Sequence, residues 1–423
     1  MSNGSESVVD DVKQAKAALS NIDWSFHPGP ALSETELKPF NARKYHWYPA
    51  TFVPEIPFTL IEILTSPGAT VYDPFSGIGT TYFQALSLNR KPIGTDICKV
   101  AVDYTENLST LFDPDCDHQK VLHSLEEKFD EYSDGVDYST EVSDEILLDE
   151  LRPWYSEPDF QKFCFLFQLE AANENRFEKA ALRIAISDAL KSHCSQNRGW
   201  GCVADNMHPK EEQIMDKRAL SGVSSKLQVL LRDIDDHLAT AGDYYDEIYS
   251  SIRDSQTIFH TDVREFTDIV DESVDLVVTS PPYPEMTDYV AAQRLSYYWL
   301  GEKVGLSDRF NNDMNTEIGA RRKRSRGSSN REYLEMMYEA NENIVSKVAE
   351  GGYLCYVLPE IDDDEDERKE IVSKVLTDIE NRNEMSRIED YMRVIPSNRR
   401  SHNIKWTSLN QERISLFRKN DES

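Results

Sequence analysis

The architecture of this chain follows from one segment, Val71-Tyr72-Asp73-Pro74-Phe75-Ser76-Gly77-Ile78-Gly79-Thr80-Thr81. It predicts a short strand, a glycine turn and then a helix over 80–88, because Gly77 and Gly79 permit positive φ and let a ligand approach the backbone closely. A second strand follows and ends in Asp96. A strand, a glycine turn, a helix and a strand ending in an acid about 20 residues later are typical of nucleotide-type binding at a parallel sheet.

The chemistry of this turn favours a cationic ligand. The glycines do not form G-x-G-x-x-G and no lysine follows them, which argues against a dinucleotide or a P-loop phosphate. Asp73 stands just before the turn and suits a sulfonium that also carries an ammonium group. Asp96 can accept hydrogen bonds from both hydroxyls of a ribose.

A second signal lies about 200 residues downstream, where an apolar run over 274–279 enters Ser280-Pro281-Pro282-Tyr283. The two prolines have fixed φ, lack N–H groups and bias the preceding residues away from helix. Neighbouring carbonyls can therefore accept hydrogen bonds from a ligand, with a hydroxyl on one side and an aromatic ring on the other. Such a turn suits a planar group with an exocyclic amine, as in a flipped nucleobase.

Taken together, the segments over 73–81 and 279–283 resemble the motifs of the S-adenosylmethionine-dependent amino-methyltransferases of DNA. Serine before Pro-Pro resembles the cytosine-N4 branch more than the adenine-N6 branch. The segment over 46–57 is similar to the element that precedes the glycine turn in such enzymes. Many cytosine-N4 enzymes place the Ser-Pro-Pro motif before the glycine turn, whereas here it follows. This permuted arrangement leaves the position of the target-recognition region open.

The resemblance implies S-adenosyl-L-methionine as the cofactor and assigns residues to it. The implied cofactor-binding residues are Tyr48, Phe52, Asp73, Pro74, Phe75, Ser76, Gly77, Gly79, Thr80, Thr81, Asp96, Ile97, Asp262 and Thr279. Asp262 would face the adenine amino group, although an acid at this place is equally typical of a helix N-cap. Tyr48 and Phe52 would close over the methionine end, although such aromatic residues commonly belong to the core.

The resemblance also implies that Ser280, Pro281, Pro282 and Tyr283 form the catalytic turn. The Ser280 hydroxyl and the Pro281 carbonyl would accept hydrogen bonds from the target amine and aim its lone pair at the methyl carbon. Tyr283 would stack on the extruded base. Direct transfer of this kind needs no covalent intermediate and no cysteine nucleophile.

At 423 residues the chain can hold one catalytic domain and a sizeable insertion. We expect an α/β fold, a doubly wound Rossmann-like methyltransferase sheet, with a mainly helical insertion. The expected parts are a lead-in over 1–40, a catalytic domain over 41–114 and 256–423, and an insertion over 115–255 that is a candidate target-recognition region. We further expect residues 1–20 to be frayed and residues 311–330 to form a polar loop.

The formal net charge of −30 opposes binding to a phosphate backbone. Either the protein does not touch nucleic acid or it works in concentrated salt, where the Debye length falls to roughly 3 Å at 1 M. We favour the second interpretation and expect a cytoplasmic, nucleoid-associated protein of a high-salt prokaryotic cell. No apolar stretch is long enough to span a membrane, and the start lacks the features of a leader. The six cysteines lack C-x-x-C spacing and are expected to be free thiols, with no metal site.

Basic residues stand out in so acidic a chain and are the candidates for DNA contact. One run comprises Arg321, Arg322, Lys323, Arg324 and Arg326, and is expected to be a mobile loop that holds phosphates. Its alternative is a solvated loop that offsets local acid. The other candidates are Arg399, Arg400 and Asn403, whose groups suit base edges, and Arg198 and Trp200 in the insertion.

The pattern as a whole predicts a site-specific DNA methyltransferase acting on the N4 amine of cytosine in double-stranded DNA. The alternatives are adenine-N6 methylation of DNA, RNA methylation, and a catalytically silent nucleic-acid-binding protein of the same fold. The recognition sequence, the oligomeric state and the presence of a restriction endonuclease partner are left open.

Overall fold

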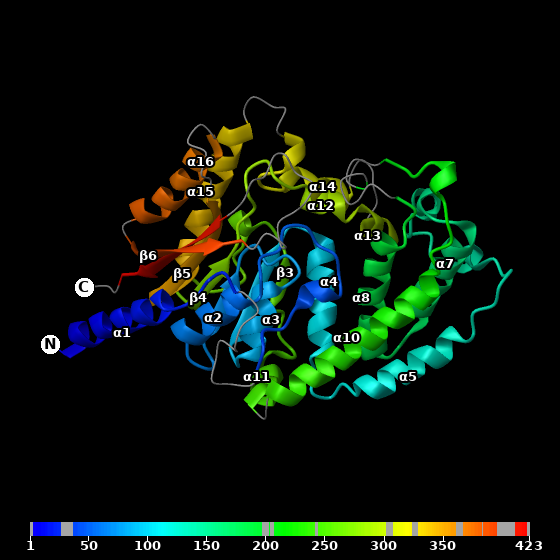
Figure 1. The fold of residues 1–423 in the computed structure, drawn as a ribbon, viewed down its shortest axis with the longest axis horizontal. Helices are drawn as coiled ribbons and strands as arrows, with labels where there is room; N and C mark the ends of the chain where they lie inside the picture. Colours follow the sequence, from blue (N-terminus) through cyan, green and yellow to red (C-terminus); the bar gives the residue numbers. More distant parts are fainter. Residues whose placement is uncertain are drawn as a thin grey trace.

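The structure is a computed structural model that describes residues 3–26, 37–196, 203, 207–241, 244–301, 308–323, 329–360, 367–382, 384–395 and 411–420. Its centre is a seven-stranded sheet with the strand order β3-β2-β1-β4-β5-β7-β6 (Figure 1). The strands are β1 (Thr70–Asp73), β2 (Lys91–Asp96), β3 (Ile258–His260), β4 (Val274–Thr279), β5 (Val348–Glu360), β6 (Met385–Val394) and β7 (Gln411–Lys419).

All neighbouring strands are parallel except those that pair with β7, which runs antiparallel to both β5 and β6. This confirms the predicted doubly wound α/β sheet. The chain moves outward from β1 through β2 to β3, and then crosses back to place β4 on the other side of β1. Such a reversal opens a crevice at the carboxyl ends of the two central strands, which is where ligands bind in open α/β sheets.

Helices cover both faces of the sheet because successive residues of its strands are apolar and point to opposite faces. Tyr72 and Val277 face one side, where they pack with Met337 of α15 (Ser329–Lys347) in a cluster that also includes α16 (Glu367–Asn381). Val71 and Leu276 face the other side, in a cluster with α1 (Asn3–Ser20), α2 (Glu55–Leu64) and α3 (Thr80–Ser87). The period of two in the strands thus makes the three-layer arrangement.

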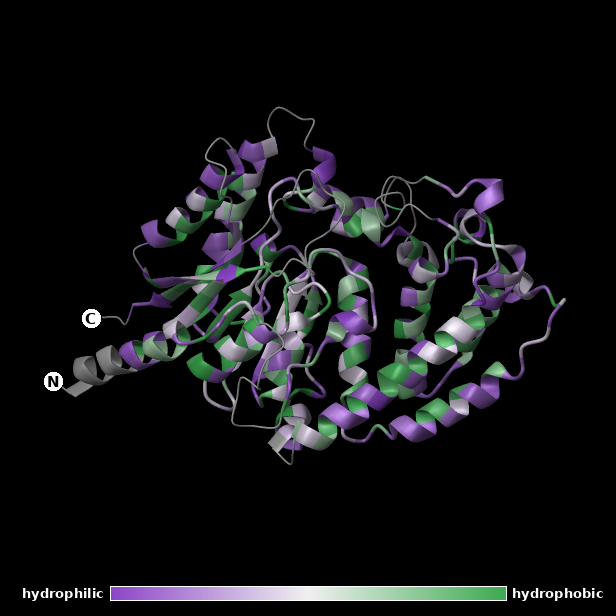
Figure 2. Ribbon diagram, viewed as in Figure 1, coloured by the Kyte–Doolittle hydropathy of each residue, from purple (hydrophilic) through white to green (hydrophobic). Residues whose placement is uncertain are grey.

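The segment over 115–255 is mainly helical, as predicted, and lies to one side of the sheet (Figure 1). Its helices are α5 (His118–Phe129), α6 (Leu148–Leu151), α7 (Glu157–Ala172), α8 (Arg176–Ser192), α10 (Ala219–Ala241) and α11 (Tyr244–Ile252). Figure 2 shows hydrophilic and hydrophobic residues along α5 and α10, as expected for helices with one buried side. One hydrophobic cluster joins these helices to α3 and to α4 (Lys99–Leu111), so the segment packs directly on the sheet's own helices.

The remaining described helices lie mostly above the carboxyl ends of the strands. They are α12 (Tyr289–Ala292), α13 (Arg294–Trp299) and α14 (Arg309–Thr316). Short 3-10 helices cover Ala42–Lys44, Tyr138–Glu141, Arg152–Trp154, Glu211–Gln213, Val263–Glu265 and Arg321–Lys323.

Two local predictions were wrong. Residues 3–20 form α1 instead of a frayed end, since Leu19 is buried in the core and Lys16 forms an ion pair with Glu389 of β6 at 2.6 Å. The expected polar loop over 311–330 contains α14, because the Asp308 side chain caps that helix by accepting a hydrogen bond from the Asn311 amide at 2.7 Å. A short polar helix of this kind has little apolar periodicity to reveal it.

Within the described part of the chain, each helix is too short or too polar to cross a lipid bilayer. The cysteines there are free and buried: Cys98, Cys116, Cys164, Cys194 and Cys355. Burial raises the pKa of the Cys116 thiol to about 12, so this thiol stays protonated at neutral pH.

Candidate active site

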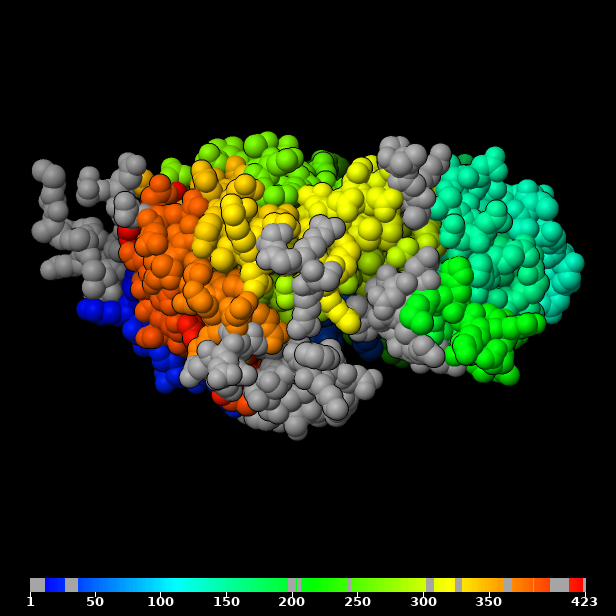
Figure 3. All heavy atoms as spheres, turned by 90° about the horizontal axis from the view of Figure 1, so that it is seen from above, coloured from blue at the N-terminus to red at the C-terminus, as the bar shows by residue number. Residues whose placement is uncertain are grey.

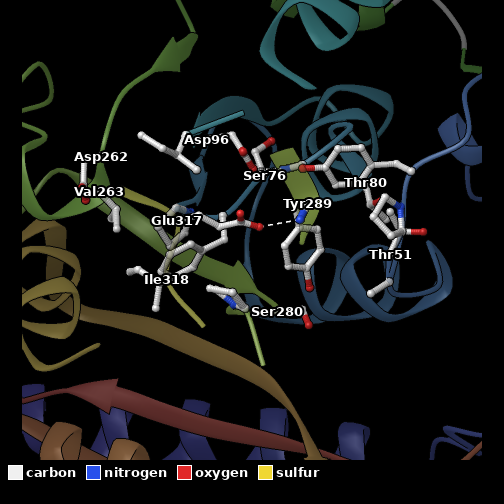
Figure 4. Close-up of a pocket in the computed structure, with 18 of the residues that line it drawn as sticks. Thr51, Ser76, Thr80, Asp96, Asp262, Val263, Ser280, Tyr289, Glu317 and Ile318 are labelled. Atoms are coloured by element: carbon white, nitrogen blue, oxygen red, sulfur yellow. Dashed lines mark hydrogen bonds between the residues drawn. The ribbon is translucent and has the colours of Figure 1, made fainter. Parts of the chain in front are cut away.

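A cavity opens at the carboxyl ends of β1, β2, β3 and β4 (Figure 4). The lining residues are Tyr48, Pro49, Ala50, Thr51, Phe52, Pro74, Phe75, Ser76, Gly77, Thr80, Asp96, Ile97, Thr261, Asp262, Val263, Ser280, Pro282, Tyr289, Thr316, Glu317 and Ile318. The segment before α2, the glycine turn and the Ser-Pro-Pro turn therefore share one cavity.

The two glycines of the turn have different uses. Gly77 has φ of 52° and lines the cavity, where an added Cβ would lie 3.4 Å from the Tyr48 ring. Gly79 has φ of 75° and an added Cβ there would lie 2.9 Å from both Phe83 and Thr105, away from the cavity. Gly77 thus keeps the backbone open to a ligand, while Gly79 lets the start of α3 pack closely.

Asp73 ends β1 and is only 1% exposed, just behind the cavity wall. Its Oδ1 accepts hydrogen bonds from the Thr279 hydroxyl at 2.6 Å and from the Phe75 amide at 3.1 Å. Its Oδ2 is buried without a hydrogen-bond partner among the described residues. Burial raises the pKa of Asp73 to about 6, and its hydrogen bonds offset only part of this effect.

Asp96 ends β2 and lines the cavity. Its Oδ2 accepts a hydrogen bond from the Gly77 amide and its Oδ1 from the Cys98 amide, both at 2.7 Å. Burial raises the pKa of Asp96 to about 6 in spite of these two bonds. Each carboxylate oxygen keeps a further lone pair, so both can still accept a ligand hydroxyl.

Ile97 and Asp262 form the wall next to Asp96. The Ile97 carbonyl accepts a hydrogen bond from Nε2 of His260 at 2.9 Å, which holds the wall to β3. Asp262 caps the 3-10 helix that follows β3 by accepting the Arg264 amide at 3.0 Å, and it also forms an ion pair with the Arg264 guanidinium. The capping role weighed for Asp262 is therefore present, at a residue that also lines the cavity.

The Ser-Pro-Pro turn leaves the end of β4 beside β1. Ser280 and Pro282 line the cavity, whereas Pro281 and Tyr283 lie next to it without lining it. The Ser280 hydroxyl donates to the Tyr283 hydroxyl at 3.4 Å. The Pro282 carbonyl accepts a hydrogen bond from the Tyr333 hydroxyl of α15 at 3.0 Å, so α15 holds the turn in place.

Most of the predicted cofactor-binding residues lie on the cavity wall, and the others support it from behind. Asp73, Gly79, Thr81 and Thr279 are the supporting residues, and the Thr81 hydroxyl donates to the Val278 carbonyl of β4 at 3.2 Å. Tyr48 stacks on Tyr289 with 5.9 Å between the ring centroids. Sequence reasoning alone missed Tyr289 and Glu317.

Glu317 is the most unusual of the missed residues. It is 2% exposed, and its carboxylate accepts a hydrogen bond from the Tyr289 amide (Figure 4). It accepts a second one from the Arg322 guanidinium. Burial raises the pKa of Glu317 to about 7, although Arg322 acts in the opposite direction. No motif surrounds Glu317 in the sequence, and only the folding of residues 283–301 and 308–323 over the strand ends brings it to the cavity.

The basic run is only partly available for an external partner. Arg321 is exposed, whereas Arg322 bonds to Asp288 and Glu317, and Lys323 donates to two main-chain carbonyls. The other predicted DNA-contacting residues lie outside the described residues: Arg198, Trp200, Arg324, Arg326, Arg399, Arg400 and Asn403. Over the described ranges, no three His, Cys, Asp or Glu side chains gather as a metal site.

Comparison with known proteins adds two likenesses. Residues 6–107 match the sequence model of the DNA methylase family N6_N4_Mtase, a range that contains the glycine turn and ends before Ser280. The chain is also similar to the type II methyltransferase M.MvaI of Kocuria varians, with 24% identity over 298 residues. That match covers 66% of this chain and 62% of the relative, so the chain spans about three fifths of the length of that protein.

Proposed function

We propose that this chain is a site-specific DNA methyltransferase that transfers a methyl group from S-adenosyl-L-methionine to the N4 amine of cytosine. One observation carries the proposal. The hydrogen bond of 2.6 Å from Thr279 to Asp73 joins two motifs that lie 206 residues apart in the chain. This bond brings the glycine turn and the Ser-Pro-Pro turn to one cavity, which supports a direct transfer between the ligands proposed for them.

The polar groups around the cavity suit the cofactor. Ser76 lines the cavity, and its Oγ is buried without a hydrogen-bond partner among the described residues, so a bound carboxylate group would satisfy it. Asp73 lies just behind the wall, where its negative charge would attract an ammonium group. Asp96 offers two oxygens to the ribose hydroxyls, and Gly77 leaves room beside Tyr48. When bound, the cofactor supplies an electrophilic methyl group on a positively charged sulfur.

The residues of the catalytic turn would prepare the amine for that methyl group. The amine of cytosine is a weak nucleophile because its lone pair is delocalised into the ring. The Ser280 hydroxyl and the Pro281 carbonyl would accept its N–H groups and favour a pyramidal nitrogen, while Tyr283 stacks on the base. Burial raises the pKa of Tyr283 well above its usual range, so its ring stays a neutral phenol. Orientation and electrostatics would carry the rate.

The position of Ser280 favours cytosine-N4 over adenine-N6, because serine stands where the adenine branch has an acid or an amide. Digestion of methylated DNA to nucleosides and mass spectrometry distinguish N4-methylcytosine from N6-methyladenine. Parallel incubations with DNA and RNA separate DNA methylation from RNA methylation. If neither DNA nor RNA receives a methyl group, the result would support a catalytically silent nucleic-acid-binding protein.

Two substitutions test the catalytic turn. Ser280→Ala and Tyr283→Ala should reduce methyl transfer by at least about a hundredfold, the lower end of the usual loss when an orienting or electrostatic group is removed. Cofactor binding should stay within about twofold of wild type, because neither change touches the glycine turn. Wild-type turnover in both variants would refute the assignment of this turn.

The working conditions and the DNA contacts are part of the proposal. The net charge of −30 suits a high-salt cytoplasm, where screening weakens repulsion between the acidic surface and DNA. The segment over 115–255 and the basic residues around 321–326 and 399–403 are the proposed DNA-contacting parts. Single-molecule sequencing of DNA from cells that express the protein would return the methylated base and the recognition sequence together.

A further inference from the structure

The cavity wall opposite the glycine turn is built from a second part of the chain. Thr316, Glu317 and Ile318 line the cavity and follow α14 directly. Seen from above in Figure 3, yellow atoms that include α14 spread across the middle of the molecule, between the orange α16 region and the green and teal helices of the 115–255 segment. This wall therefore belongs to the cover over the strand ends.

Main-chain contacts tie this wall to the catalytic turn. The Glu285 amide donates to the Gly319 carbonyl at 2.9 Å, and Thr287 pairs with Ala320 in a β-bridge. An added Cβ at Gly319 would lie 2.8 Å from the Tyr283 carbonyl, so the two segments touch closely. Glu317 is thus held at a defined place relative to the residues that would hold the target base.

An ion-pair trio orients the Glu317 carboxylate. Nη1 of Arg322 lies 2.7 Å from Glu317 Oε2 and 3.2 Å from Asp288 Oδ1. The Arg322 amide also donates to Asp288 at 3.0 Å, which fixes the guanidinium between the two acids. The Lys323 ammonium bonds to the main-chain carbonyl of Glu317.

The Arg322 guanidinium therefore forms ion pairs with two buried acids, Asp288 and Glu317. These three groups carry an excess negative charge when both acids are ionised. The raised pKa of Glu317 agrees with this incomplete compensation, because Asp288 and burial oppose ionisation while Arg322 favours it. Asp96 lines the same cavity, and its pKa is also raised. A ligand that brings a positive charge into the cavity would relieve the unfavourable charge of both walls.

We propose that Glu317, oriented by Arg322 and Asp288, makes the cavity prefer the positively charged methyl donor over the neutral product left after transfer. The inference rests on the proposed function. S-adenosylmethionine has a charged sulfonium where S-adenosylhomocysteine has a neutral thioether, and the two ligands are otherwise alike apart from the methyl group. An acid that acts on that charge changes the ratio of their affinities, whereas a residue that only shapes the cavity changes both affinities together.

The test measures dissociation constants of the full-length protein for both ligands by isothermal titration calorimetry, without DNA. Glu317→Gln keeps the shape of the side chain and its carbonyl acceptor. It should lower the preference for S-adenosylmethionine by about tenfold, which corresponds to roughly 1.4 kcal/mol of lost attraction. Glu350→Gln is the matched control, because Glu350 is exposed near the opposite end of β5 and its loss should leave the preference unchanged.

A second variant guards against misfolding of the first. Asp288 does not line the cavity, and Asp288→Asn removes charge from the trio without touching a ligand. It should lower the same preference by about threefold, roughly half of the free-energy effect of Glu317→Gln. Equal weakening of both ligands in Glu317→Gln, or an unchanged preference in Asp288→Asn, would overturn the inference and leave the proposed function standing. Failure of wild type to bind either ligand would overturn both.

Discussion

Replacing Asp73 by Asn should make the ligand-free protein more stable at neutral and alkaline pH. Asp73 is 1% exposed, and one of its oxygens has no hydrogen-bond partner among the described residues. The amide keeps an acceptor for the Thr279 hydroxyl and the Phe75 amide, but it carries no charge. Buried unpaired charge is unfavourable, and sites that bind ligands commonly retain it at the expense of stability.

The size of the effect follows from the pKa of Asp73, which is about 6 in the folded protein against an ordinary value of 3.8. The folded state therefore binds more protons than the unfolded state between these values, and wild type loses stability as the pH rises through them. At 1.36 kcal/mol for each pH unit, the loss is about 3 kcal/mol above pH 7. Asp73→Asn should gain about this amount at pH 8, and by the same linkage less than about 1 kcal/mol near pH 4.

Urea unfolding of ligand-free protein at several pH values between 4 and 8 measures this difference, because the midpoint shifts while the slope stays constant. The salt concentration is kept fixed throughout. Under the proposed function, the same variant should also bind S-adenosylmethionine more weakly, because the negative charge of Asp73 just behind the cavity wall would attract the cation. A variant that is equally stabilised at pH 5 and pH 8, or destabilised at pH 8, would refute the reasoning about a buried, strained carboxylate.

Three further predictions follow from the site. Gly77→Ala should weaken cofactor binding by about tenfold or more. A left-handed φ costs roughly 1–2 kcal/mol for alanine, and the added methyl would lie 3.4 Å from Tyr48. Unchanged cofactor affinity in equilibrium dialysis would contradict this prediction. Tyr333→Phe removes the hydrogen bond to the Pro282 carbonyl. Tyr333→Phe should lower the single-turnover rate of methyl transfer and reduce the free energy of unfolding by about 1 kcal/mol. Cofactor affinity should be unaffected and serves as the control. An unaltered rate would show that the bond from Tyr333 to Pro282 does not orient the turn. DNA affinity should depend on salt much less steeply than the slope of about −10 known for a basic repressor, and an equally steep slope would argue against a high-salt enzyme.

Local structure was predictable where one short segment carries its own signals. The glycine turn between β1 and α3 is such a case, because positive φ at Gly77 and Gly79 is available to glycine without strain. The nearly continuous apolar runs of β1 and β4 likewise predict strands buried on both faces, and parallel strands place their carboxyl ends at one edge. The contact of Asp73 with Thr279 also requires that β1 and β4 be neighbours, which is a property of the tertiary structure.

Residues that reach the site from irregular segments were not predictable in the same way. Glu317 and Tyr289 come from stretches without periodicity, and their place depends on contacts such as the bridge between Thr287 and Ala320. The internal role of Arg322 was hidden for the same reason, since a basic run in an acidic chain looks the same whether it meets DNA or a buried carboxylate.

The sequence alone determined the class of sheet, the glycine turn and the polar and aromatic groups of the Ser-Pro-Pro turn, because backbone sterics and apolar periodicity act between near neighbours. Only the tertiary structure decided which acids share the cavity, how far their pKa values rise and which cations are already paired. Those properties depend on burial and on distances between segments far apart in the chain, and no local pattern of residues contains them.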